Sequence, residues 1–234
     1  MFNKALVAAA ALTLSGVASA NFGNMAIVSG TLTADNHYGV YLGDADGSNL
    51  SFIGRNEYGD AGSPGQYNWS LAETWEFLAA PGQYLYVMAW DDGGPQGWIG
   101  SFSWHSGELD SNTSDWVSAV APAGNPGKSG DLPSSGVLSG YIAGATWTAP
   151  AASAANGSSP WGSIAGVGDA QWIWHDTLAD NSLSNANFAM FRSANPLVAA
   201  VPEPSTYAMM GLGLGMVLLV VRRKRQTGND RVFA

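Results

Sequence analysis

Short runs in which apolar and polar residues alternate predict a chain built mostly of β-strands. Successive side chains of a strand point to opposite faces, so a repeat of two residues marks one. Such runs occur at residues 26–33, 37–42, 50–54, 83–90, 98–104, 171–174 and 188–192. In the run at 83–90, the smaller aliphatic residues are expected on one face, namely Leu85, Val87 and Ala89. Tyr84, Tyr86, Met88 and Trp90 are expected on the opposite face of the same strand.

The segments between these runs are typical of turns and loops. Residues 43–49 and 91–95 are rich in Asp and Gly, and Pro81-Gly82 precedes the run at 83–90. Helical periodicity is weak, and only residues 71–78 predict one or two helical turns. Residues 124–159 are rich in Gly, Ala, Ser and Pro. We interpret them as a long ordered loop within one β-sandwich spanning 21–200, the alternative being a linker between two domains.

The first twenty residues have the order of a secretory signal peptide. Lys4 supplies a positive charge, an apolar run follows from residue 5 to about 14, and small residues occupy 18–20. The run is shorter than the ~20 residues that span a bilayer. A buried N-terminal helix is the alternative, and the signal-peptide interpretation predicts a mature chain that begins near Asn21.

The C-terminal region combines an apolar segment with a basic cluster. Residues 207–221 carry no charge, and as a transmembrane helix they cover ~22 Å of a hydrocarbon core of ~30 Å. Four basic residues at 222–225 favour a cytoplasmic end, followed by a short cytoplasmic tail at 227–234. Pro202 and Pro204 prevent the helix from extending upstream. These features alone also fit an ordinary single-span anchor.

Taken in order, the Pro-Glu-Pro turn, the apolar segment and the basic cluster at 201–226 resemble the PEP-CTERM sorting signal of Gram-negative bacteria. The residues that carry the resemblance are Val201, Pro202, Glu203, Pro204, Ser205, Thr206, Arg222, Arg223, Lys224 and Arg225. The resemblance implies export as an inner-membrane precursor and recognition by an exosortase, a membrane protease-transpeptidase. The helix would anchor the precursor in the membrane transiently, and the body would pass to the cell surface or the exopolysaccharide matrix.

The body is strongly acidic and contains no cysteine. Residues 21–200 include three basic and sixteen acidic residues, a net charge of −13. Such a surface repels phosphates, which excludes a nucleic-acid partner, and it favours solubility and metal cations. Without cysteine, stability has to come from packing and bound ions rather than disulfides. All ten tryptophans lie between Trp69 and Trp174, as expected for a β-rich extracellular domain.

The body also resembles a galactose-binding-domain-like jelly roll. The resemblance uses a polar tip before a Tyr-rich strand at 33–42, the strand that ends at Trp90, and aromatic positions near the end of the body. Those positions are Asp115-Trp116, Trp161, residues 170–174 and residues 188–192. It implies an all-β, jelly-roll-like sandwich, and many such domains bind carbohydrate, although a fold does not fix a function.

Catalytic motifs are weak. His37, His105 and His175 lack metal-ligand spacing, and no G-x-S-x-G sequence occurs. Four glutamates could supply a glycosidase pair if two of them lay close enough, namely Glu57, Glu73, Glu76 and Glu108. We therefore expect a non-enzymatic protein with no catalytic residue.

Two binding sites are nevertheless predicted. Tryptophan faces near polar side chains suit sugars, which indicates a carbohydrate site at Trp90, Asp91, Asp92, Gln96 and Trp98. Most tryptophans of such a sandwich are core residues, however. Oxygen ligands alternate at Asp44, Asp46 and Ser48, as a structural Ca²⁺ site requires, the alternative being a plain hairpin turn at Asp46-Gly47. No other cofactor is expected.

Together these features predict an exported surface or matrix protein that associates with exopolysaccharide in a biofilm or floc. Its expected partners are the exosortase and the secretion machinery during export, and the polysaccharide afterwards. Two alternatives stay open, an exported glycan-acting enzyme and a self-associating structural surface protein.

Overall fold

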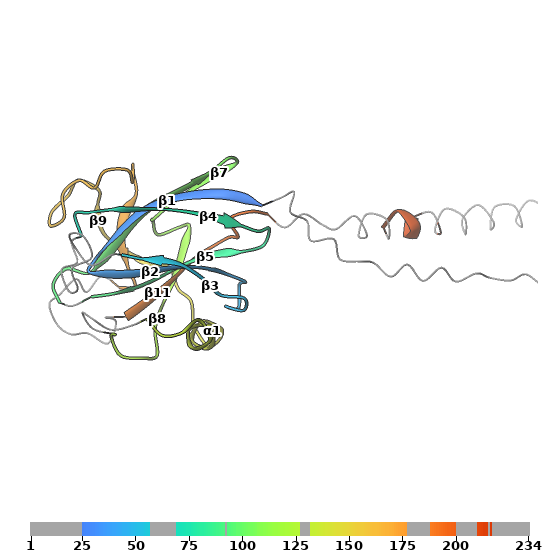
Figure 1. Ribbon diagram of the computed structural model, residues 1–234, viewed down its shortest axis with the longest axis horizontal. Helices are drawn as coiled ribbons and strands as arrows, with labels where there is room; N and C mark the ends of the chain where they lie inside the picture. Colours follow the sequence, from blue (N-terminus) through green and yellow to red (C-terminus); the bar gives the residue numbers. More distant parts are fainter. Residues whose placement is uncertain are drawn as a thin grey trace, which may run out of the picture.

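The computed structural model describes residues 25–56, 69–91, 93–126, 132–176, 188–199, 210–214 and 216. Two antiparallel sheets lie face to face (Figure 1). Sheet I has the order β4-β1-β6-β10-β9, and β7 also pairs with β6. Its strands are β1 (Ala26–Asp35), β4 (Glu73–Ala79), β6 (Gly97–Trp104), β7 (Gly107–Asp110), β9 (Ala151–Ala155) and β10 (Gln171–Trp174). These pairings confirm the all-β prediction for the described part of the body.

Sheet II has the order β3-β2-β5-β11-β8. Its strands are β2 (His37–Gly43), β3 (Ser51–Arg55), β5 (Tyr84–Trp90), β8 (Trp116–Val120) and β11 (Phe188–Ser193). The single helix of the described body, α1 (Ser135–Ala143), packs on the outer side of this sheet (Figure 1). All seven predicted strands are therefore present, with bounds shifted by no more than two residues.

The main core lies between the two sheets and is strongly aromatic. Trp98 of sheet I meets the edges of Trp116 and Phe191 of sheet II, with ring centroids 4.7 and 5.5 Å apart. Leu85, Val87 and Ala89 face this core, as the alternation in β5 predicts. Edge-to-face aromatic contacts of this kind add to the energy of simple area burial, so this cluster is a principal source of stability.

The outer faces of both sheets are covered as well. Tyr86, Met88 and Trp90 on the second face of β5 pack in a cluster with Leu138 and Ile142 of α1. On sheet I, the loop at 156–170 packs Trp161, Ile164 and Val167 in a cluster with Ile99 and Trp172. Burial on both faces explains why β5 carries apolar or aromatic residues at every position, and why Trp98 and Ile99 follow one another in β6.

Two segments differ from their predicted structures. Residues 71–78 do not form helical turns, because 73–79 pair as β4 with β1, with Ala79 opposite Ala26. The buried Phe77 and Ala79 alternate with the exposed Glu76 and Leu78, which is the repeat of a strand. Residues 124–159 contain α1 and β9 rather than loop alone, and β9 pairs with β10.

Both ends of the folded body meet at the turn between β4 and β5. The N–H of Gly82 donates to the carbonyl of Val198, and the N–H of Leu197 donates to the carbonyl of Gln83, both at 2.9 Å. β1 starts beside the same turn, since Ala26 pairs with Ala79. The connections from β1 to β2 and from β5 to β6 lie at the opposite end (Figure 1).

Residues 210–214 and 216 are helical, with Met210, Leu212, Leu214 and Met216 exposed. Within the described residues, none of the helices has the length and apolar character needed to cross a membrane. The predicted signal peptide at 1–20 and the rest of the predicted transmembrane helix at 207–221 lie outside the described residues.

Candidate functional site

Trp90 and Trp98 do not form the predicted sugar-stacking platform, because both side chains are completely buried. Trp98 lies in the core between the sheets. Trp90 lies on the outer face of sheet II, where His37 stacks on it with centroids 4.9 Å apart and the Arg55 guanidinium carbon lies 5.3 Å from its ring. A sugar ring needs an open aromatic face, so the prediction is wrong for these two residues.

Asp91 and Gln96 do come together, as predicted, but they brace the loop. Both are 1% exposed. The Asp91 carboxylate accepts hydrogen bonds from the N–H of Gly93 at 2.8 Å and from the Gln96 amide at 3.3 Å. The carbonyl of Gln96 accepts a hydrogen bond from Ser153 at 3.2 Å. Asp92 lies outside the described residues, and the other predicted residues point inward rather than toward a ligand.

A second buried carboxylate, Asp35, lies at the same end of the sandwich. Its two oxygens accept hydrogen bonds from the Trp161 indole N–H and the Asn36 amide, each at 2.8 Å. Asn56 ties this corner to β2, since it donates to the Asn36 carbonyl at 2.8 Å and accepts from the Tyr38 N–H at 3.0 Å. A buried carboxylate is costly unless it is hydrogen-bonded. These contacts therefore hold the corner together, and the distance of Trp161 along the chain hides the pair from sequence reasoning.

The predicted calcium ligands do gather on one loop, between β2 and β3. Ser48 donates its hydroxyl toward Asp44 at 3.0 Å and Asp46 at 2.7 Å, and its N–H to Asp46 at 2.9 Å. The two bonds to Asp46 hold the pKa of its carboxylate below the ordinary value, and the bond from the Ser48 hydroxyl contributes most. The loop joins two antiparallel strands and Gly47 has a φ of 79°, so the hairpin is confirmed. Within the described ranges, no three His, Cys, Asp or Glu side chains are grouped so that they could hold a metal ion, and the calcium site stays a prediction.

The glutamates considered as a glycosidase pair differ in their surroundings. Glu73 accepts a hydrogen bond from the Tyr38 hydroxyl at 2.9 Å, and that hydroxyl accepts one from the Trp75 indole at 3.0 Å. Burial is the main reason that the pKa of Tyr38 lies well above its ordinary value. Glu76 is exposed on β4, and Glu57 lies outside the described residues. Glu73 thus links the two sheets through Tyr38.

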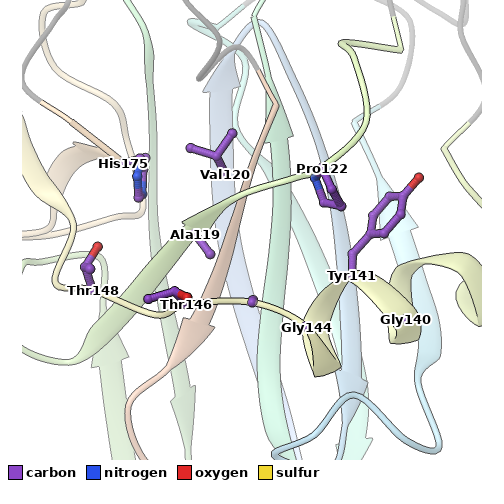
Figure 2. A pocket seen from close by; sticks show the side chains of 10 residues that line it. Ala119, Val120, Pro122, Gly140, Tyr141, Gly144, Thr146, Thr148 and His175 are labelled. Carbon is purple, nitrogen blue, oxygen red and sulfur yellow. The ribbon is translucent and has the colours of Figure 1, made fainter.

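A groove of about 520 Å³ opens on the outer side of sheet II, at its β8 edge (Figure 2). Tyr141 of α1 stands at one side of it, and His175 and Thr148 stand at the other. The lining residues are small, apolar or hydroxyl-bearing apart from His175, and Asp, Glu, Lys and Arg are absent among them. They are Ala119, Val120, Pro122, Gly140, Tyr141, Gly144, Ala145, Thr146, Thr148 and His175. We call this feature the Tyr141 groove.

Hydrogen bonds to β8 fix the wall that carries Thr146, Thr148 and His175. Ser118 and Thr148 exchange both backbone hydrogen bonds, at 2.7 and 2.9 Å. The Ser118 hydroxyl lies 3.1 Å from Nδ1 of His175, which sets the orientation of the imidazole ring. Ser118 itself is completely buried, so it positions His175 and does not reach the groove as a nucleophile.

The other parts of the groove are also anchored. Leu138 and Ile142 are buried against sheet II and hold α1 in place. Arg192 lies between the Trp147 and Tyr84 rings, at 4.9 and 5.1 Å, and fixes the segment between Thr146 and Thr148. The groove is thus formed by residues from three separate parts of the chain, 119–122, 140–148 and 175. No local pattern in the sequence indicated it.

The sorting signal predicted from the tail is confirmed by comparison with known families. Residues 200–225 match the family described as the PEP-CTERM protein-sorting motif. The match includes every predicted sorting residue from Val201 to Arg225, all of which lie outside the described residues. The motif identifies an exported substrate of an exosortase in a Gram-negative bacterium. No curated protein and no solved structure matches the chain, and the jelly-roll resemblance of the body stays a prediction.

Proposed function

We propose that the folded body is a non-enzymatic component of the cell surface or extracellular matrix, where it associates with exopolysaccharide and supports biofilm or floc cohesion. The sorting motif at 200–225 is the observation that carries this proposal. A chain addressed to an exosortase is made to act outside the cell, attached to or released from the envelope. The polymer matrix is the material that it meets there.

The arrangement of the chain ends supports the same proposal. Residues 197–198 and the start of β1 lie together at the β4–β5 turn. The tail is therefore joined to the body at this end, and the connections from β1 to β2 and from β5 to β6 lie at the end away from the point of attachment. The net charge of −13 over 21–200 disfavours direct contact with an anionic polymer. The partner is therefore a neutral polysaccharide or one bridged by divalent cations.

Fractionation of the producing bacterium tests this proposal. The mature protein should co-purify with extracellular polymer, and a strain without it should form weaker biofilm or floc that the wild-type gene restores. A variant with Pro202→Ala and Pro204→Ala is the matched control, because it alters the sorting motif and leaves the body unchanged. Protein that stays in the envelope fraction in the wild type, with normal cohesion in the deletion strain, would refute the proposal.

A further inference from the structure

We propose that the Tyr141 groove binds a short segment of a neutral polysaccharide. This inference rests on the proposed function and adds to it a location and a class of sugar. Trp90 and Trp98 of the predicted carbohydrate site are buried, whereas the polar and aromatic groups of the Tyr141 groove reach solvent. The groove volume of about 520 Å³ lies within the range of small-molecule sites, roughly 300–1,000 Å³.

The lining has the chemistry that a neutral sugar requires. A pyranose ring presents C–H faces that pack on aromatic and apolar side chains, and hydroxyls that exchange hydrogen bonds. Tyr141, Pro122, Ala119 and Val120 supply the apolar surfaces. Thr146, Thr148, the Tyr141 hydroxyl and His175 supply donors and acceptors on both sides. The groove therefore offers paired polar and apolar contacts to one ligand.

Charge selects against acidic sugars. The lining contains no Lys or Arg to pair with a carboxylate. The acidic surface of the body adds a general repulsion. A uronic acid would lose water at its carboxylate without gaining a cationic partner, whereas a neutral hexose loses only hydroxyl hydration that the groove can replace.

Gly140 of α1 lines the groove and leaves it open at this point. A Cβ added at Gly140 would meet no atom within 4 Å, so a larger side chain there would extend into open space from the groove wall. Glycine is the least favourable ordinary residue inside a helix apart from proline. Gly140 therefore lowers the helix propensity of α1, and it leaves this part of the groove lining without a side chain.

The same property gives a sharp experiment. Gly140→Leu should fill part of the groove without disturbing the core. Gly136→Leu is the matched control, because Gly136 also lies in α1, also has no atom within 4 Å of an added Cβ, and does not line the groove. Both variants should melt at or above the temperature of the wild type, since leucine favours a helix.

Binding is measured with the full-length chain, in a detergent without a sugar headgroup. The probes are cello-, manno- and galacto-oligosaccharides, oligogalacturonate as an anionic counterpart, and native exopolysaccharide from the producing strain. We expect the wild type to bind a neutral oligosaccharide and the native polymer. Gly140→Leu and Tyr141→Ala should each weaken binding about tenfold or more, equivalent to ~1.4 kcal/mol, while Gly136→Leu leaves it unchanged.

The other outcomes separate this inference from the proposed function. Equal binding of the native polymer by the wild type and Gly140→Leu would overturn the groove as the site and leave the proposed function standing. Tighter binding of oligogalacturonate than of the neutral probes would overturn the assignment to neutral sugars. No binding of the native polymer or of any oligosaccharide by the wild type would overturn both.

Discussion

Replacing Trp161 with phenylalanine should destabilise the sandwich through a single lost hydrogen bond. The indole N–H of Trp161 donates to Asp35 at 2.8 Å, and the Asp35 side chain is only 7% exposed. Leaving a buried charged group without one of its partners costs about 1.5–3 kcal/mol. For a domain of this size, each kcal/mol lowers the melting temperature by roughly 2–4 °C. Trp161→Phe should therefore lower it by about 3–12 °C.

Trp172→Phe provides the matched control for this prediction. Trp172 stacks on Trp161 with ring centroids 4.2 Å apart, and it is equally deep in the cluster on the outer face of sheet I. Its own indole N–H has no hydrogen-bond partner within the described structure. Phenylalanine at 172 removes a similar ring area without breaking a hydrogen bond. Differential scanning calorimetry of both variants decides the matter, and equal losses of melting temperature would show that ring packing, rather than the bond to Asp35, accounts for the effect.

Three further predictions follow from the tail, the hairpin loop and the buried tyrosines. The intact mass of surface-extracted protein should correspond to a chain that has lost the residues after roughly the Pro202-Glu203-Pro204 turn, and the presence of residues 222–234 would reduce the tail to a simple anchor. Calcium, if held by Asp44 and Asp46, should raise the melting temperature relative to chelator by mass action, whereas identical values would leave the hairpin as the whole explanation. Burial raises the pKa of Tyr41 and Tyr86 to about 12, above the ordinary value of 10.0, and it also raises the pKa of Tyr38 well above that value. Between about pH 10 and 12 these tyrosine hydroxyls thus keep protons in the folded state that they lose in the unfolded chain. Their contribution to the free energy of unfolding is therefore fully present below about pH 10 and is lost as the pH rises toward 12. Tyrosinate absorbance followed together with circular dichroism checks this, and ionisation of these tyrosines near pH 10 in the intact fold would contradict it.

The strands are predictable from the sequence because the alternation that marks them is local. The segments that cover the outer faces of the sheets, α1 and the loop at 156–170, are not. The alternation in β5 assigns Leu85 and Val87 to one face and Tyr86 and Met88 to the other, and the structure has them so. The helix that covers the second face is rich in Gly and Ser, and only Leu138 and Ile142, four residues apart, are buried. Such a segment gives little periodic signal, so its helical state depends on packing against the sheet.

The sequence places the carbohydrate site at the wrong tryptophans, because closeness along the chain does not show whether an aromatic face is open. Trp90 and Trp98 lie close to acidic and amide residues in the sequence, which suggested an exposed binding loop. Whether an aromatic face is open depends on what packs over it, and His37 and Phe188 pack on Trp90 from distant parts of the chain. The Tyr141 groove joins residues 119–122, 140–148 and 175, so its parts meet only after β8, α1 and β10 are in place.

The burial of the tryptophans also explains how an exported chain without cysteine keeps its fold. All ten tryptophans fall within the described residues, and none of them is exposed. Six are buried, and they join the two sheets to each other and to the coverings on their outer faces. Aromatic packing needs no oxidant, so the stability that it gives does not depend on the redox conditions of the compartment. The six buried tryptophans present no open face to a ligand, which is why Tyr141, His175 and the threonine hydroxyls of the groove are the appropriate residues to test.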